Sequence, residues 1–417
     1  MAPPTTVSPN VFQRVFKAFH YRDFRLMFIG ACISSVGTWM QILAQAWLVL
    51  DLTKSPKHPN GDPFILGLDA FLAGIPVFLL SIIGGVVADR FERRRILLFS
   101  QYVQMTSAFI LTLLLVFHVV QIWHVLCLSF ISGTAQSFGG PAYSALIPTL
   151  VKKEDMPNAI ALNSIQFNLA RVIGPAIGGV VFDKLGSAWC FGLNGLSFLA
   201  PVISLTILTT RYLPEKTAES VWASMKQGFR FIRRQGSIEA LIVLAFSLTA
   251  LSLPMMTFLP WFARTVFSGV WTYTLFMVSS GVGAVTGSLG VAYLGNIGHK
   301  GRITLGSLVW LGLGITGFAL SKSVVLSCIL LFLTGVGLMA VFTNVLSLVQ
   351  LITPNEMRGR VMSIYNSAFR GGMPMGNLVA GWLVPMFTAP IVLAFNGVLL
   401  VVLALYFLLV QRKVAAL

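Results

Sequence analysis

The sequence predicts an all-α membrane protein of about twelve transmembrane helices, arranged as two pseudo-symmetric six-helix halves. The first observation is composition, since 56% of the 417 residues are hydrophobic and only 10% are charged, against roughly 25% charged in a soluble domain. A soluble chain with a mean hydropathy of +0.84 would expose more apolar surface than water tolerates. This excludes cytosolic enzymes, secreted domains and disordered chains. The spacing of the apolar runs and an internal repeat are the other two observations.

The apolar runs define the expected helices in order, because each is near the length of about 20 residues that crosses a bilayer. Six runs precede a polar stretch and six follow it. The expected helices are 24–50, 64–88, 95–117, 121–148, 156–182 and 188–209, then 238–263, 271–295, 302–320, 324–351, 360–386 and 389–410. We therefore divide the chain into an N-terminal six-helix half with its tail (1–209), a linker (210–236) and a C-terminal half (237–417).

The linker has the pattern of an amphipathic helix. Its apolar residues Trp222, Met225, Phe229 and Ile232 fall on one helical face, and basic residues lie around the rest. Such a helix suits the anionic surface of a membrane. We expect it to tether the two halves.

The internal repeat joins the fifth and eleventh expected helices. Both carry the pattern R-x-x-x-P, which is Arg171 with Pro175 in the fifth helix and Arg370 with Pro374 in the eleventh. Parallel repeats of this kind are typical of transporters, with the solute site between the halves.

The net charge of +16 does not indicate a nucleic-acid partner, because no basic stretch is long enough to form a groove-binding surface. Most of the lysines and arginines fall in the connections on one side of the expected spans. Basic connections are cytoplasmic in multi-pass proteins. We therefore expect both termini in the cytoplasm.

A small-residue and charge motif follows the second expected helix. Small residues let two helices approach closely, and a carboxylate there can accept hydrogen bonds from a neighbouring helix N-terminus. The alternative is a solvated loop that only orients the chain. The candidate gate residues are Gly85, Asp89, Arg90, Arg93 and Arg94.

This motif resembles the signature G-x-L-A-D-R-x-G-R-R of the major facilitator superfamily, except that Val87 replaces its Leu and Glu92 replaces its Gly. A second signature, G-P-x-x-G-G, is associated with antiporters in that superfamily. Its longer form begins with a Gly where this chain has Ala170. The residues that match the second signature are Gly174, Pro175, Gly178 and Gly179.

Further stretches are similar to one branch of that superfamily, which contains bacterial enterobactin exporters and macrolide efflux proteins. They include 37–40, 46–50, 157–164 and 358–362. The resemblance covers essentially the whole chain and implies the major facilitator fold in a bacterial inner membrane. It also implies that Asp89 caps the start of the eleventh helix when the cytoplasmic side is shut. Partners would lie near 358–361 and at Glu154 or Asp155.

Two carboxylates are candidates for proton coupling. Asp69 lies within the second expected helix, where an ionisable group is costly and is a candidate for function. The alternative is that Asp69 is hydrated at the cavity mouth or paired with a basic group such as Arg264. Asp51 ends the first expected helix and is more interfacial.

Arg171 and Arg370 fall within expected spans, and arginine keeps its charge in proteins. Two arginines with no carboxylate expected at their depth favour an anionic solute. The alternative is structural, with each guanidinium bound to helix carbonyls.

Helices 1, 4, 7 and 10 line the cavity in the superfamily, so the resemblance nominates further substrate-binding residues. Apolar walls with a few amides suit bulky amphipathic solutes. The nominated residues are Trp39, Gln41, Gln45, Gln136, Tyr143, Trp261 and Asn344.

The sequence carries no metal-binding histidine pair and no Walker A motif, so we expect neither an enzyme nor a cofactor. We expect a monomeric secondary transporter that exports drugs or siderophores by proton antiport with alternating access. Two alternatives remain open. One is a uniporter or importer of an organic anion or lysolipid, and the other is a non-transporting membrane receptor or scramblase.

Overall fold

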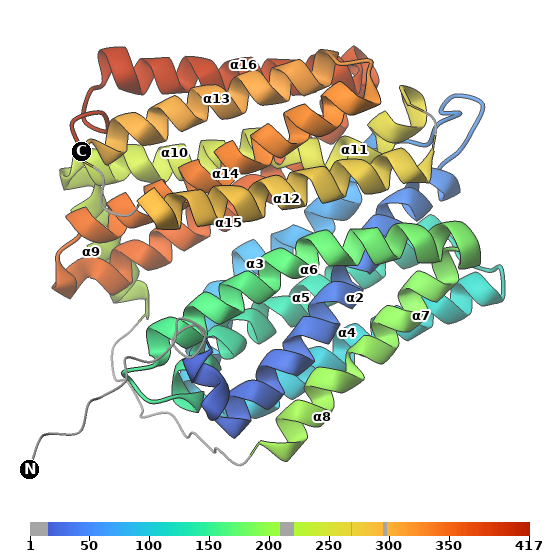
Figure 1. Cartoon of the computed structure of the whole chain (residues 1–417), viewed down its shortest axis with the longest axis horizontal. Coiled ribbons are helices and arrows are strands. Elements are labelled where there is room, and N and C mark those ends of the chain that lie inside the picture. Colours follow the sequence, from blue (N-terminus) through green and yellow to red (C-terminus); the bar gives the residue numbers. More distant parts are fainter. Residues whose placement is uncertain (1–15, 209–220, 268, 295–297) are drawn as a thin grey trace, which may run out of the picture.

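The computed structural model describes residues 16–208, 221–267, 269–294 and 298–417, and the regular elements within these ranges are all helical (Figure 1). Up to the linker they are η1 (Lys17–His20), α2 (Arg22–Leu52), α3 (Pro63–Arg90), α4 (Arg93–Val116), α5 (Ile122–Leu146), η2 (Ile147–Leu150), α6 (Met156–Leu185), α7 (Ser187–Ser197) and α8 (Leu199–Ile207). The remainder are α9 (Val221–Arg234), α10 (Gly236–Ser252), α11 (Pro254–Thr265), α12 (Val270–Leu294), α13 (Lys300–Leu320), α14 (Val324–Ile352), α15 (Asn355–Phe387), α16 (Ala389–Leu405) and η3 (Tyr406–Val410).

The helices have the length and composition of membrane spans. Within the described part of the chain, ten helical stretches are long and apolar enough to cross a bilayer. Two further helices, α5 and α15, have 25 and 33 residues but more polar and glycine positions. Large apolar side chains such as Leu79, Phe99 and Val325 are exposed, as contact with lipid requires. The chain is therefore an all-α membrane protein, and the expected twelve helices are consistent with this structure.

Two of the expected helices are interrupted, and proline explains both interruptions. The expected helix 188–209 divides at Phe198 into α7 and α8, and 238–263 divides at Leu253 into α10 and α11. A proline lacks the N–H that would bond to the carbonyl four residues earlier. The carbonyls left without this bond are those of Ser197, next to the first break, and Ala250, in the last turn before the second.

The helices form two groups that lie side by side in Figure 1. The first helix group runs from α2 to α8 and the second from α10 to α16. Between the groups, α3 packs along α15 and α6 packs along α12. Successive spans run in opposite directions, with α7–α8 and α10–α11 each forming one span, so the bundle has two ends. We name them the Asp51 end, which carries the α2–α3 connection, and the Asp89 end, which carries the α3–α4 connection and the C-terminus.

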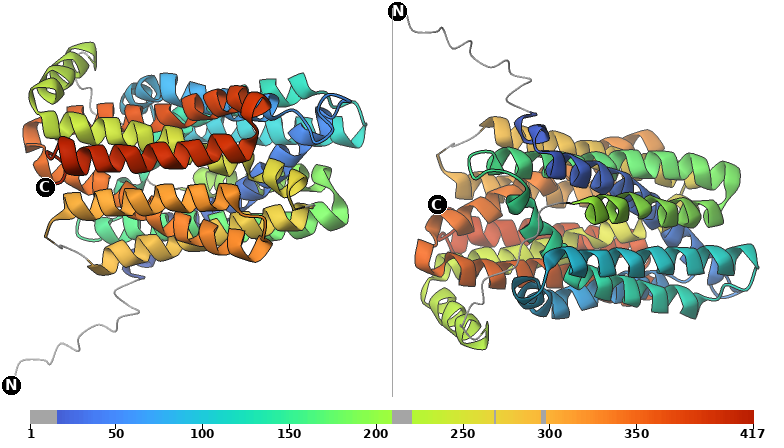
Figure 2. Two further views of the ribbon diagram at one scale, coloured as in Figure 1. Left: turned by 90° about the horizontal axis from the view of Figure 1, so that it is seen from above. Right: turned by 90° about the horizontal axis from the view of Figure 1, so that it is seen from below.

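The linker helix α9 lies at a corner of the bundle in Figure 2 and packs on α15, where Gly228 lies against Arg360 and Ile364. Ile232 is buried, but Phe229 is exposed and stands beside the Arg233 guanidinium. The expected common apolar face is therefore divided, because Ile232 packs on the protein and Phe229 does not. The side chains of Trp222 and Met225 lie outside the described residues.

Candidate functional site

Asp69 of α3 is held in a cluster of neutral donors inside the first helix group. Its residue is 7% exposed. Ser129 Oγ of α5 donates a hydrogen bond to Asp69 Oδ1 at 2.5 Å, and Gln45 Nε2 of α2 donates to Asp69 Oδ2 at 2.9 Å. Among the residues that the structure describes, no cation forms an ion pair with Asp69. The carboxylate is thus buried with hydrogen bonds but without a compensating charge.

The cluster continues along α2 toward α7. Gln45 Nε2 also donates to Ser129 Oγ at 2.9 Å, and Gln41 Nε2 lies 3.5 Å from Gln45 Oε1. Asn194 Nδ2 of α7 donates to Gln41 Oε1 at 2.5 Å. Gln41 and Gln45, nominated as substrate-binding residues, therefore have protein partners in a polar network that crosses four helices.

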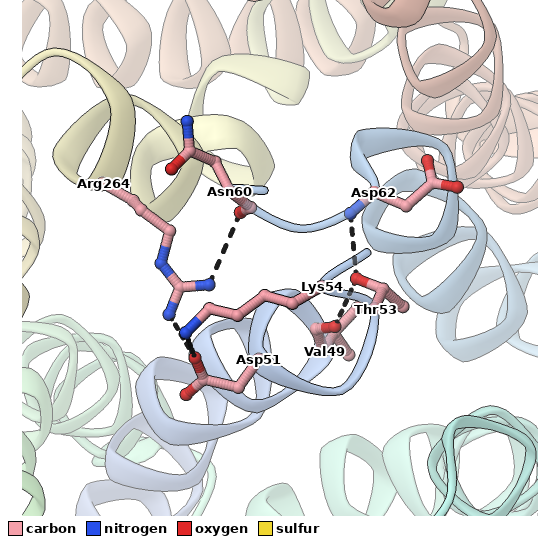
Figure 3. Close-up of polar contacts among 7 residues, drawn as sticks. All are labelled: Val49, Asp51, Thr53, Lys54, Asn60, Asp62 and Arg264. Atoms are coloured by element: carbon pink, nitrogen blue, oxygen red, sulfur yellow. Dashed lines mark hydrogen bonds and ion pairs between the residues drawn. The ribbon is translucent and has the colours of Figure 1, made fainter. Parts of the chain in front are cut away.

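The suggestion that Arg264 pairs with Asp69 is wrong. Arg264 Nη2 instead binds Asp51 Oδ1 at 2.5 Å, and Lys54 Nζ binds the same oxygen at 2.8 Å (Figure 3). Asp51 therefore lies between two cations at the end of α2. Its surroundings differ in kind from those of Asp69, because Asp51 is already neutralised by opposite charge.

Arg171 lies midway along α6 and faces an aromatic ring instead of a carboxylate. Its guanidinium carbon is 5.7 Å from the centre of the Trp39 ring, and that ring is 6.2 Å from the ring of Phe167. Over the described ranges, neither Arg171 nor Arg370 forms an ion pair. Arg370 is exposed on α15.

The gate residues cluster at the Asp89 end, but Asp89 does not cap α15. Its side chain is 60% exposed and lies 3.7 Å from Arg93 Nη2 in its own helix group. Asp155, named as a possible gate partner, binds Lys17 and Tyr21 instead. An added Cβ at Gly85 would meet no neighbouring atom within 4 Å. The surface of α3 at Gly85, where the motif predicts the close approach of another helix, is therefore uncovered in this conformation.

Two arginines of the gate motif tie the first helix group together. Arg93 Nη1 donates to the Ala145 carbonyl at 2.9 Å, at the end of α5. Arg94 Nη2 and Nη1 donate to the carbonyls of Thr206 and Leu208 at 2.6 and 3.0 Å, at the end of α8. Basic side chains at helix C-termini satisfy orphan carbonyls there. Arg90 is exposed.

The glycines of the antiporter-like signature face two directions. Gly174 and Gly178 lie against Trp39 and Met40 of α2, within the same helix group. Gly179 faces Thr274 of α12 in the other group. Of these three glycines, only Gly179 has its close neighbour across the groups. Pro175 is buried in α6.

The remaining nominated residues do not join the Asp69 network. Tyr143 donates to Asn163 Oδ1 of α6 at 2.6 Å. Gln136 accepts from Gln104 Nε2 of α4 at 3.4 Å. Trp261 and Asn344 are half-buried in the second helix group.

Sequence reasoning missed two residues that complete these sites. Ser129 is the closest partner of Asp69, and the Trp47 ring lies 4.4 Å from the Arg264 guanidinium carbon. Ser129 is one of several serines in α5, and no pattern distinguishes it. Trp47 could have been found from its helical spacing, since it lies one turn before Asp51 on α2.

Comparison with known proteins identifies the fold and the family. The family model described as transmembrane secretion effector matches residues 14–416. The enterobactin exporter EntS of Salmonella typhi is 25% identical over 397 residues, which covers 93% of this chain and 92% of the relative. The multidrug efflux pump Tap of Mycolicibacterium fortuitum is 24% identical over 369 residues, covering 85% of this chain and 88% of the relative.

Solved transporter structures share the fold at low identity. The nucleoside transporter NupG superposes with a TM-score of 0.70 at 15% identity, over 93% of this chain and 98% of that one. A POT family transporter in complex with 5-aminolevulinic acid gives 0.75 at 12%, over 94% and 96%. The relatives and the structural neighbours are transporters, not enzymes. The chain belongs to the transmembrane secretion effector family of the major facilitator superfamily, and its matched relatives are efflux proteins.

Proposed function

We propose that this protein exports amphipathic small molecules in exchange for protons and that Asp69 is the residue that carries the proton. The observation behind this proposal is the Asp69 cluster, a buried carboxylate that accepts hydrogen bonds from Ser129 and Gln45. Ionisable residues inside a membrane span are functional candidates by default. Because the described partners of Asp69 are neutral, binding one proton would bring the net charge of the cluster to zero and would turn one acceptor oxygen into a donor.

The cluster lies where a change of charge can affect helix packing. Asp69, Ser129 and Gln45 belong to α3, α5 and α2, which are three helices of one group. A ligand shifts a conformational equilibrium only through different affinities for the two states. A proton at Asp69 meets this requirement when the packing of these three helices differs between the states.

Alternating access is supported by the packing of the two groups, which is closer toward the Asp51 end than toward the Asp89 end. Close approaches between the groups lie toward the Asp51 end, where Gly67 meets Asn377 and Gly381, and Gly179 meets Thr274. Gly85 and Gly359 near the other end have open space. We assign the Asp89 end to the cytoplasm, with both termini, because basic residues gather there. On this assignment 1–209 and 237–417 act as the two moving halves, joined by 210–236.

The proposed solute is an aromatic or amphipathic molecule with negative charge. The relatives are named for export of enterobactin and for multidrug efflux. Arg171 and Trp39 present a cation beside an aromatic ring at mid-helix, which suits a solute that combines both properties. We propose that the protein works as a monomer.

The test is efflux from a bacterial host that lacks its major drug pumps. Cells that express the wild type, Asp69→Asn or the control Asp183→Asn are loaded with a fluorescent amphipathic dye or a catecholate siderophore, with and without a protonophore. Asp183 is an exposed carboxylate near the end of α6. We expect several-fold lower accumulation in wild type and Asp183→Asn, abolished by protonophore, and no lowering in Asp69→Asn at equal membrane expression. Protonophore-sensitive efflux by Asp69→Asn would contradict the proton role of Asp69.

A second candidate is a uniporter or importer of an organic anion, favoured by the two arginines without described carboxylate partners. In that case Asp69→Asn would leave transport intact and independent of pH, whereas Arg171→Gln would abolish it. If no compound of either class moves, both candidates are excluded.

A further inference from the structure

The Asp51 end carries a contact between the helix groups that is centred on Arg264 of α11 (Figure 3). The side chain is 10% exposed, and its Nη2 donates to Asp51 Oδ1 at 2.5 Å. Its Nη1 lies 3.4 Å from the Asn60 carbonyl oxygen, and its guanidinium carbon lies 4.4 Å from the Trp47 ring centre. Arg264 thus binds the end of α2 and the α2–α3 connection from the opposite group. By contrast, the ion pairs of Lys17 and Arg95 lie within the first group.

The surface that receives Arg264 is built in advance by the first helix group. Gly61 has a φ of +91°, and a Cβ there would lie 2.7 Å from the Leu50 Cα, so the connection folds back tightly on α2. Thr53 Oγ1 donates to the Val49 carbonyl at 2.7 Å and accepts from the Asp62 N–H at 2.9 Å. These bonds fix the connection that presents the Asn60 carbonyl to Arg264.

Lys54 binds the same carboxylate oxygen of Asp51 as Arg264 does. Its Nζ lies 2.8 Å from Asp51 Oδ1, and the side chain is 51% exposed. Lys54 belongs to the same group as Asp51, so separation of the groups leaves this pair in place. Arg264 belongs to the other group, so separation breaks its pair with Asp51. The Asp51 side chain is 38% exposed, and it keeps one cation in both cases, so its charge stays paired when the groups separate.

We propose that Arg264 is a latch that holds the Asp51 end shut through its bond to Asp51. Lys54 stays paired with Asp51 when that bond breaks. This inference rests on the proposed alternating access. It predicts that removal of Arg264 and removal of Lys54 have opposite effects on opening, although both side chains bind the same oxygen of Asp51. Removing Arg264 takes a bond from the shut state alone and favours opening. Removing Lys54 leaves Asp51 unpaired in the open state and favours closing.

The experiment measures distances between spin labels in purified protein in nanodiscs, with the native cysteines replaced. One label pair is introduced by Lys57→Cys and Lys322→Cys at the Asp51 end, and another by Glu154→Cys and Arg358→Cys at the Asp89 end. All four positions are exposed. Each pair has one label in each helix group, so its distance reports the opening of one end.

We expect Arg264→Gln to raise the ratio of long to short distances at the Asp51 end by about tenfold, the size of a typical coupling between states. The distance at the Asp89 end should shorten in parallel. Asp51→Asn should act in the same direction while leaving Arg264 against Trp47, which keeps the test available if Arg264→Gln is poorly folded. Lys54→Gln should shift the ratio the other way.

The proposal is overturned if both Arg264→Gln and Asp51→Asn give the wild-type distances, or if Lys54→Gln opens the Asp51 end as Arg264→Gln does. The measurement needs no substrate and no proton gradient. If the efflux assay shows no proton coupling, the spin-label distances therefore still test the latch on their own.

Discussion

At the scale of single residues, two carboxylates near the Asp51 end differ in what neutralises them. Asp51 binds two cations on one oxygen, and Asp69 binds a serine and a glutamine. The charge of Asp51 is matched by two cations, whereas the described partners of Asp69 are neutral. On this difference of partners rest the two proposed roles, a latch at Asp51 and proton transfer at Asp69.

A third carboxylate, Asp155, anchors the start of the chain to α6 at the Asp89 end. Lys17 Nζ binds its Oδ1 at 2.6 Å, and the Tyr21 hydroxyl donates to its Oδ2 at 2.8 Å. The hydrogen bond from Lys17, followed by that from Tyr21, lowers the pKa of Asp155 below its ordinary value of 3.8. A lowered pKa means that the contact stabilises the fold above the ordinary value and that this contribution is lost as pH falls through the lowered pKa.

We therefore predict that Asp155→Asn lowers the Tm at pH 7 and that the difference from wild type shrinks as the pH falls below about 4. The Tm is measured by intrinsic fluorescence in detergent across this range. Glu154→Gln, at an exposed neighbour, is the control and should follow wild type at every pH. If the Tm difference between wild type and Asp155→Asn is as large at pH 3 as at pH 7, the negative charge of Asp155 is not what stabilises the fold.

At the scale of helices, small residues set how closely neighbouring helices approach, both between the two groups and within one group. On α6, Gly179 faces Thr274 of α12, and on α15, Gly372 and Gly376 face α10. Small residues at helix contacts replace the hydrophobic driving force that lipid does not supply. The position of each glycine on its helix therefore decides whether it holds one group together or joins the two.

We predict that Gly179→Ala destabilises the protein by about 1 to 3 kcal/mol, the cost of overpacking a close contact. The control is Gly290→Ala on α12, where an added Cβ meets nothing within 4 Å, so this variant should be neutral or slightly more stable. Thermal unfolding of both variants in the same detergent measures the difference. Equal effects would contradict the role assigned to Gly179.

The helices themselves were predictable from sequence, because a run of apolar residues of membrane length has few other structures open to it. The breaks at Phe198 and Leu253 were not predicted, since prolines are tolerated within membrane helices and only sometimes divide them. Asp69 was predictable as a candidate site because it is charged within an apolar run. Its partner Ser129 was not, because it lies 60 residues away on another helix whose rotation the sequence does not specify.

At the scale of the whole molecule, the two ends of the bundle differ in how the groups meet. Toward the Asp51 end the groups approach closely and share the Arg264 contact, and toward the Asp89 end Gly85 and Gly359 have open space. Which end is more closely packed could not be predicted, because the apolar runs specify the helices but not how closely the two groups approach at each end. The assignment of residues to the two ends follows from helix order alone.

We predict that a thiol introduced by Gly85→Cys reacts with a membrane-impermeant maleimide at least about tenfold faster than one introduced by Gly74→Cys. Gly74 lies on the same helix but faces Pro374, with an added Cβ at 3.2 Å from that ring. Both variants are made without the native cysteines. Labelling of Gly85→Cys in inside-out vesicles but not in intact spheroplasts would support the cytoplasmic assignment of the Asp89 end, and the reverse pattern would contradict it.

The exposed arginines and lysines at the Asp89 end also influence the arrival of solute. Arg90, Lys152, Lys153 and Arg358 are all exposed there, on a chain whose net charge is +16. Clustered charge of one sign raises the local concentration of oppositely charged molecules and speeds their diffusional capture, and added salt weakens this attraction. The positive potential at this end would therefore attract an anionic solute before it reaches the bundle. Its rate of capture would fall as ionic strength rises, whereas a neutral solute would arrive at the same rate at any salt concentration.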